Sequence, residues 1–214
     1  MIRGGAMTPE ARERKTIVIG LTGGIATGKS TVARMLARRG AVVINADEVG
    51  HEVLRRGGAE WRAVVRAFGK AILTPDGEID RSKLAECVFA EPTARQRLNK
   101  LLHPTMIRRI TRQVNEYYAR GYKLITIEAA VLFEMGLNHI VDEVWVTHAP
   151  PRMQRQRLLK RRMTPRDASA RISAQLAGSE FIKRAMRVIN CNRSYHFTEQ
   201  LVNHLLQSLG VTFG

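Results

Sequence analysis

The sequence predicts an α/β fold in which a parallel sheet is flanked by helices. Short runs of β-branched and apolar residues alternate along the chain with longer segments of helical periodicity, and this alternation is typical of strands joined by crossover helices. A glycine-rich stretch follows the first apolar run and leads into a helical segment. A hydrophobic content of 44% in 214 residues is enough for one domain with its own core.

Five segments have the composition of strands and predict a five-stranded sheet. They are 17–21, 41–44, 123–127, 143–147 and, with the weakest signal, 187–189. Helical periodicity is found in segments 29–39, 47–55, 60–68, 82–89, 92–101, 104–120, 151–161, 165–176 and 197–209. Proline lies in or near the first turn of several of these segments, where its missing N–H costs no hydrogen bond.

The order of these segments predicts one domain, 16–214, with two helical additions. The stretch between the second and third strands is too long for one crossover, so we expect a helical insertion over about 50–121 that holds an acceptor. The two helices of about 151–176 are joined by a basic turn and predict a mobile lid, with a plain helical hairpin as the alternative. The remaining assignments are a core of 16–46, 122–150 and 186–214, and a flexible N-terminal extension over 1–15.

The run from Gly23 to Ser30 matches the phosphate-binding pattern G-x-x-x-x-G-K-[ST] between a buried strand and a helix. Glycines let successive backbone N–H groups point into one concavity, and the helix N-terminus adds partial positive charge. Lys29 would reach the β- and γ-phosphates, and the Ser30 hydroxyl would hold Mg²⁺. The alternative is a chance match in an ordinary strand–helix turn. We predict a nucleoside triphosphate site formed by Gly24, Ile25, Ala26, Thr27, Gly28, Lys29, Ser30 and Thr31.

Two carboxylates follow predicted strands, at the sheet edge where ligands bind in open α/β folds. Asp47 lies just after the second strand and can orient an acceptor hydroxyl; the alternative is that it caps the helix beginning at Glu48. Glu128 ends the third strand, where it can hold Mg²⁺ through a water together with Ser30. The sequence has no N-K-x-D motif of the kind that GTPases use to bind their base, so phosphate transfer to an acceptor is favoured.

The formal net charge of +16 is concentrated near the C-terminus. Between Arg152 and Arg193 there are 12 lysines and arginines against 2 acids, which predicts a polyanionic ligand, with a solvated helix face as the alternative. Aromatic residues make up only 6%, and no apolar run approaches the roughly 20 residues of a membrane span, so we expect neither nucleic acid nor membrane as a partner. Two distant cysteines predict no disulfide framework and therefore the cytoplasm.

Several motifs in succession make the chain resemble the dephospho-CoA kinase family over about 17–209. The segment GLTGGI with the later GKS resembles the opening motif of the family, and Asn45-Ala46-Asp47 resembles its D-A-D. The segment GEIDRSKL at 77–84 resembles G-x-[IL]-[DN]-R-x-x-L, and LFE at 132–134 resembles the end of P-L-L-F-E. The spacing of glutamine and arginine over 154–175 resembles the lid pattern Q-x-x-R-L-x-x-R…R-I-x-x-Q.

This resemblance implies a P-loop kinase fold and transfer of the ATP γ-phosphate to the ribose 3′-hydroxyl of dephospho-CoA, the last step of coenzyme A synthesis. Asp47 falls on the position of the catalytic base. Arg161, with Arg157, falls on lid positions that close over the developing charge beside Lys29. The acceptor would be bound by Asp47, Glu128, Arg81 and His103. For Arg81 the alternative is a surface turn with Asp80, and for His103 it is a helix start fixed by Pro104.

The sequence departs from the family pattern at four places, one of which is a turn after Arg161 that is one residue shorter than usual. Asn45 replaces the first Asp of D-A-D, so the carboxylate chemistry rests on Asp47 alone. The run EAAV at 128–131 replaces D-V-P-L, which keeps an acid at the strand end but loses the proline. Cys191 stands where the family has its adenine-side Asn, so we assign that contact to Asn192 and leave Asn190 as the other candidate.

Two other functions are compatible with the phosphate-binding loop. One is a different small-molecule P-loop kinase, acting on a nucleotide or nucleoside. The other is a nucleotide-gated protein that binds RNA or membrane phosphates through the basic segment. The sequence leaves open ATP against GTP as donor, and a monomer against a small homo-oligomer.

Overall fold

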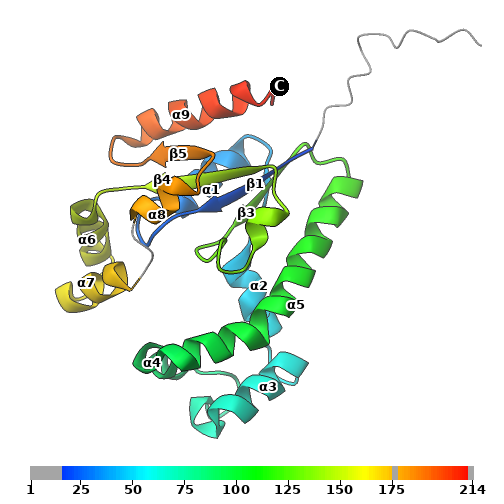
Figure 1. Cartoon of the computed structure of the whole chain (residues 1–214), viewed down its shortest axis with the longest axis vertical. Helices are drawn as coiled ribbons and strands as arrows, with labels where there is room; N and C mark the ends of the chain where they lie inside the picture. Colours follow the sequence, from blue (N-terminus) through cyan, green and yellow to red (C-terminus); the bar gives the residue numbers. More distant parts are fainter. Residues whose placement is uncertain (1–15, 175–177, 212–214) are drawn as a thin grey trace, which may run out of the picture.

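The computed structural model describes residues 16–174 and 178–211, so the predicted extension over 1–15 lies outside the described residues. A five-stranded sheet lies between two layers of helices (Figure 1). All four strand pairs are parallel, in the order β2-β3-β1-β4-β5, which confirms the predicted sheet. The strands are β1 Ile17–Thr22, β2 Val42–Asn45, β3 Leu124–Glu128, β4 Glu143–His148 and β5 Arg187–Asn190.

The register of the sheet brings the ends of β1, β2 and β3 to one edge. Glu128 at the end of β3 pairs with Leu21 of β1 and with Asn45 of β2. The chain leaves β1 for β2 on one side and later enters β4 on the other, so β1 is the point where the strand order reverses. Open α/β folds bind their ligands at such a switch point, outside the carboxyl ends of the strands.

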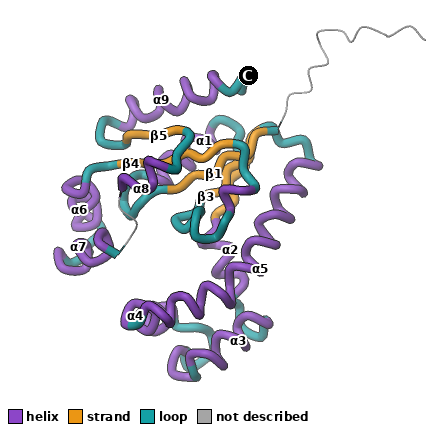
Figure 2. The backbone as a smooth tube through the Cα atoms, in the orientation of Figure 1, coloured by secondary structure: helices purple, strands orange, loops and turns teal. Residues whose placement is uncertain are grey.

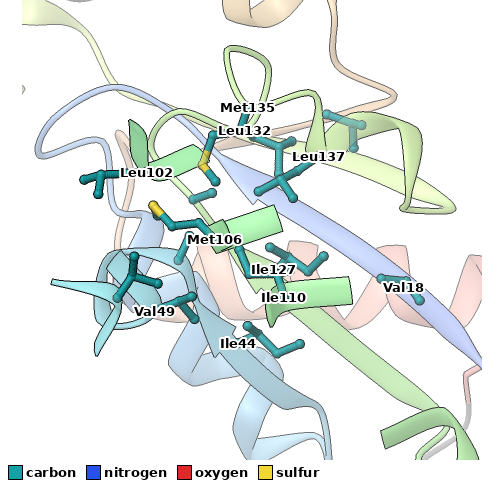
Figure 3. Close-up of a cluster of buried hydrophobic side chains, with 14 of the residues drawn as sticks. Val18, Ile44, Val49, Leu102, Met106, Ile110, Ile127, Leu132, Met135 and Leu137 are labelled. Carbon is teal, nitrogen blue, oxygen red and sulfur yellow. The ribbon is translucent and has the colours of Figure 1, made fainter. Parts of the chain in front are cut away.

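Alternating residues of the strands build a separate core on each face of the sheet. Ile19 and Leu21 pack with α1 (Lys29–Arg38) and α9 (Tyr195–Ser208) on one face. Val18 and its neighbours pack on the other face with α2 (Ala46–Val53), α5 (Pro92–Ala119) and α8 (Gly178–Lys183). Figure 3 shows Met106 and Ile110 of α5 beside Ile44 and Ile127 of the sheet.

The stretch between β2 and β3 is helical, as Figure 2 shows below the sheet. Besides α2 and α5 it contains α3 (Ala59–Phe68), a 3₁₀ turn at Lys70–Ile72 and α4 (Arg81–Ala90).

The prediction of two helices at 92–101 and 104–120 is wrong, because Pro104 lies inside the single helix α5. Proline removes one backbone hydrogen bond and bends a helix, and α5 changes direction part-way along its length (Figure 1). Buried residues on both sides of Pro104, Leu102 and Met106, belong to the same core, and this packing offsets the cost of the proline.

The segment after β4 forms α6 (Pro151–Lys160) and α7 (Pro165–Ser173), which lie beyond the edge of the sheet in Figure 1. Thr164 caps α7 by accepting a hydrogen bond from the backbone N–H of Asp167. The predicted end of this helix at 176 falls outside the described residues. The helix α8 was not predicted, because six residues are too few to give a clear period. Across 16–174 and 178–211, no helix is both long and apolar enough to cross a membrane.

Candidate functional site

The glycine-rich loop between β1 and α1 depends on backbone conformations that few residues adopt. Gly23 and Gly28 have φ values of 145° and 115°, and Ala26 between them has a φ of 58°. A side chain at position 23 would place its Cβ 2.5 Å from the Thr147 carbonyl oxygen, so only glycine fits there. The loop therefore has the tight path that the phosphate-binding pattern predicts.

The Thr27 side chain is buried beneath the loop and stabilises it by hydrogen bonds. It is 3% exposed, and its hydroxyl donates to the Gly24 carbonyl at 2.8 Å. Its oxygen also lies 2.7 Å from the hydroxyl oxygen of Thr147, at the end of β4. The Thr27 side chain therefore stabilises the shape of the loop, and Thr27 itself does not belong to the lining of the pocket formed by the rest of the loop.

Lys29 and Ser30 begin α1, and both contact one carboxylate oxygen of Glu128. The Lys29 Nζ and the Ser30 Oγ donate to Glu128 Oε1 at 2.8 and 2.7 Å. The Lys29 and Glu128 side chains are 14% and 7% exposed, so this ion pair is largely shielded from solvent. The two residues predicted to serve phosphate and metal are therefore joined to the predicted carboxylate at the end of β3.

Asp47 is not the cap of its helix, so the structural alternative for this residue is wrong. Asn45 caps α2: its Oδ1 accepts the backbone N–H groups of Asp47 and Glu48, and its Nδ2 donates to Glu48 Oε1 at 3.3 Å. The Asn that replaces the first acid of the D-A-D motif thus has a structural role of its own. Asp47 is exposed in the first turn of α2, so its side chain faces solvent at the N-terminal end of that helix.

A pocket over the carboxyl ends of the strands, here named the central pocket, brings Asp47 and Arg161 together with the loop. Asp47 lies in the first turn of α2, and Arg161 is the residue just after the end of α6. Arg34 of α1 also lines it; its guanidinium lies 3.5 Å from the Thr31 hydroxyl. The full lining is Gly23, Gly24, Ile25, Ala26, Gly28, Lys29, Ser30, Thr31, Arg34, Asp47, Ala130 and Arg161.

A second pocket, here named the side pocket, lies beside the loop between α1, α6 and the end of β5. Arg161 and Gly28 line both pockets, so the two adjoin. The full lining is Ala26, Gly28, Thr31, Met35, Arg157, Arg161, Cys191, Arg193, Tyr195 and Thr198. Neither Asn190 nor Asn192, both exposed in the described part of the chain, belongs to this lining. The adenine contact assigned to Asn192 thus stays a prediction.

Arg157 lies on α6 and reaches back to main-chain carbonyls. Its Nη1 donates to the carbonyls of Ala26 and Thr27 at 2.9 and 3.1 Å, and its Nη2 donates to that of Cys191 at 2.5 Å. Sequence reasoning paired Arg157 with Arg161 over the developing charge. Both arginines line the side pocket, but of the two only Arg161 also lines the central pocket.

Cys191 is buried at the floor of the side pocket, 4% exposed. Burial raises the pKa of its thiol to about 11, with the positive charge of Arg157 acting in the opposite direction. The thiol therefore stays protonated, and poorly nucleophilic, through neutral pH.

We expect a thiol reagent at pH 8 to modify the native protein in two phases, with exposed Cys87 first and Cys191 only on unfolding or at much higher pH. Mass spectrometry of the labelled peptides measures both rates. Equal rates at the two cysteines in the folded protein would contradict the burial of Cys191.

Arg81 and His103 belong to the helical insertion, and neither lines the central pocket. Arg81 begins α4 after the cap Asp80, and it lines a small polar pocket with His51 and Glu78. His103 lies inside α5, so the alternative that it starts a helix before Pro104 is wrong. Half-burial lowers the pKa of His103, which keeps its imidazole neutral at pH 7.

Arg34 and Tyr195 of these pockets, and Thr147 beside the loop, are among the residues that were not singled out from the sequence. Arg34 lies one turn beyond Ser30 on α1, so helical spacing from the loop could have indicated it. Tyr195 begins α9 and Thr147 is the penultimate residue of β4, and both come close to the loop only through the tertiary fold. Arg38 of α1 donates to the Tyr195 hydroxyl at 2.9 Å.

Known proteins of one family resemble this chain over most of its length. The family model for dephospho-CoA kinase matches residues 17–196. A dephospho-CoA kinase of Bacillus cereus is 39% identical over 197 residues, which cover 92% of this chain and 98% of the relative. One of Symbiobacterium thermophilum is 41% identical over 174 residues, which cover 81% of this chain and 73% of the relative.

Two solved kinase structures have a similar fold over most of their length. A dephospho-CoA kinase from Campylobacter jejuni aligns with a TM-score of 0.66 and 25% identity, covering 90% of this chain and 96% of that one. A shikimate kinase from Acinetobacter baumannii, 16% identical, aligns with a TM-score of 0.52 over 94% of this chain and 97% of that one, and so shares the fold. With a phosphate-binding loop, an acid beside it and a family match over most of its length, this chain belongs to the dephospho-CoA kinase family.

Proposed function

We propose that the chain transfers the γ-phosphate of ATP to the ribose 3′-hydroxyl of dephospho-CoA, with the central pocket as the site of transfer. The backbone of the loop and Lys29 bind the phosphates of ATP, and the nucleoside lies toward the side pocket. The adjoining walls of the two pockets at Gly28 and Arg161 support this placement, because one extended nucleotide can occupy both. The single observation that carries the proposal is the lining of the central pocket by both Asp47 and the loop.

Magnesium fits the oxygen donors at the start of α1. The Ser30 hydroxyl and the Glu128 carboxylate are hard ligands already in contact, which is the chemistry that Mg²⁺ prefers. Ser30 would hold the ion directly and Glu128 through a water, and an ion held there would neutralise charge on the phosphates. Lys29 then exchanges the Glu128 carboxylate for phosphate oxygens.

Asp47 orients the acceptor hydroxyl and accepts its proton. Asp47 is exposed and takes no part in capping its helix, so its side chain is free to accept a hydrogen bond from the acceptor hydroxyl. Arg161 meets the charge that develops on the transferred phosphoryl group. Arg81 and His103 of the insertion contact parts of the acceptor away from the ribose.

A coupled assay of ADP release tests the proposal directly. With ATP and Mg²⁺ present, dephospho-CoA should stimulate ADP release strongly, while nucleoside monophosphates should not. Turnover with a nucleoside monophosphate and none with dephospho-CoA would favour another small-molecule kinase. A salt-dependent filter-binding assay tests the RNA-binding alternative, since log affinity for RNA would fall steeply with log salt.

Glu128→Gln is expected to raise the Mg²⁺ concentration needed for half-maximal activity by about 10- to 100-fold, as loss of a group behind a metal ligand typically does. The substitution removes the negative charge of the Glu128 side chain, which accepts hydrogen bonds from Lys29 and Ser30, but keeps the size of that side chain. Initial rates across a Mg²⁺ series measure this. The control is Glu116→Gln, an exposed acid on α5. An unchanged Mg²⁺ requirement would remove Glu128 from the metal site.

We also propose that the enzyme works in the cytoplasm as a monomer or small homo-oligomer, with dephospho-CoA as its small-molecule partner. Both cysteines are free thiols, which suits a reducing compartment. Light scattering of the purified protein measures the oligomeric state.

A further inference from the structure

The loop that binds phosphate is held by a clamp from outside the loop itself. Arg157 of α6 donates three hydrogen bonds to carbonyls of two separate segments: two go to the loop, at Ala26 and Thr27, and one goes to Cys191 just after β5. Its side chain is half-buried beside the loop. A planar guanidinium with several N–H donors in fixed directions can span such a set, whereas an ammonium group cannot.

The two loop carbonyls belong to the strained part of the turn. Ala26 has a left-handed backbone, a conformation that residues with a Cβ rarely adopt, and Gly28 follows two residues later with a φ of 115°. Such a turn persists only when its surroundings hold it in place. Here Thr147 holds Thr27 by its hydroxyl from one side, and Arg157 holds the carbonyls from the other.

The direction of these carbonyls decides where the loop N–H groups point. In a trans peptide the C=O of one residue and the N–H of the next point in opposite directions. A Thr27 carbonyl turned toward Arg157 therefore turns the Gly28 N–H away from it. Gly28 lines both pockets, so its backbone faces the space that the nucleotide occupies.

The third hydrogen bond connects the loop to the turn after β5. Cys191 also packs tightly on the loop, since a Cβ added at Gly28 would lie 3.0 Å from the Cys191 Sγ. Arg157, Gly28 and Cys191 thus form one contact unit between the two pockets. Arg161, one helical turn further along, lines the central pocket as well as the side pocket and stands apart from this unit of hydrogen bonds.

We propose that Arg157 is a positioning residue. It holds the loop in its phosphate-binding shape and joins it to the Cys191 turn, so it supports binding of any nucleotide in the ground state. This differs from the catalytic role predicted beside Arg161. The inference rests on the proposed function only in requiring that the loop bind a nucleotide, and the identity of the acceptor does not enter.

The test compares Arg157→Gln and Arg157→Lys with Arg161→Ala and with the control Arg155→Gln, an exposed arginine two residues earlier on α6. Titration calorimetry with ADP and Mg²⁺ measures binding without any transferable phosphate. Hydrogen–deuterium exchange of the peptide covering 20–31, without nucleotide, reports the loop itself. Thermal melts verify that each variant is folded, and Arg157→Lys serves where the Gln variant does not fold.

Both Arg157 variants should weaken ADP binding by about tenfold or more and speed exchange in the loop peptide before any ligand is added, because the carbonyls lose charge-assisted hydrogen bonds. Their kcat at saturating ATP should fall much less than that of Arg161→Ala. Arg155→Gln should match the wild type in every measurement. Unchanged ADP affinity and loop exchange in the Arg157 variants would overturn the proposal, and a kcat loss alone would return Arg157 to the reacting phosphate. Absence of turnover with dephospho-CoA would instead count against the proposed function and leave these binding results intact.

Discussion

Replacing Asp47 by Asn is expected to lower kcat by orders of magnitude and to leave ATP affinity nearly intact. The amide keeps the size and polarity of the side chain but cannot accept the proton of the acceptor hydroxyl. Because Asn45, not Asp47, caps α2, the substitution removes no hydrogen bond that holds the helix. The loss therefore reports chemistry rather than folding.

The assay is ADP release with dephospho-CoA, beside calorimetric titration of ATP. Glu48→Gln is the matched control, since Glu48 lies in the same turn of α2 and is equally an exposed acid. This control should keep kcat close to the wild-type value. A wild-type kcat in Asp47→Asn would show that the carboxylate has no part in transfer.

The sheet could be predicted from the sequence because its signals are local. Each central strand is a short, nearly continuous apolar run, and such runs are typical of parallel strands buried on both faces. β5 had the weakest signal, and it is an edge strand with two exposed residues, Val188 and Asn190. The loop was equally readable, because its chemistry requires glycines, a lysine and a serine at fixed spacing.

The features that were not predicted depend on tertiary contacts. A proline normally ends a helix, and only packing of Leu102 and Met106 into one core carries α5 through Pro104. Nothing in the sequence around Arg157 says that its guanidinium reaches carbonyls 130 and 34 residues away. The capping role of Asn45 was local and readable in principle, since Asn followed by Glu three residues later favours a helix start.

Arg161→Ala is the second prediction with a large expected effect: kcat should fall by about 10²- to 10³-fold, with a modest change in the KM for ATP. Arg161 lies just after the last turn of α6, exposed, and lines both pockets, so its side chain can meet the transferred phosphoryl group. A contact made chiefly in the transition state lowers kcat and kcat/KM together.

The matched control is Arg162→Ala, because Arg162 is the next residue, is also exposed, and lines neither pocket in the described chain. If the positive charge alone mattered, both variants would be slowed equally. If the Arg161 side chain contacts the transferred phosphoryl group, only Arg161→Ala is slowed. A rise in KM with an unchanged kcat would mean that Arg161 binds ATP equally well before and during transfer, so its role would be in ATP binding rather than catalysis. Together with the ADP affinity of the Arg157 variants, this comparison separates two arginines one helical turn apart: one that shapes the loop and one that acts on the phosphate.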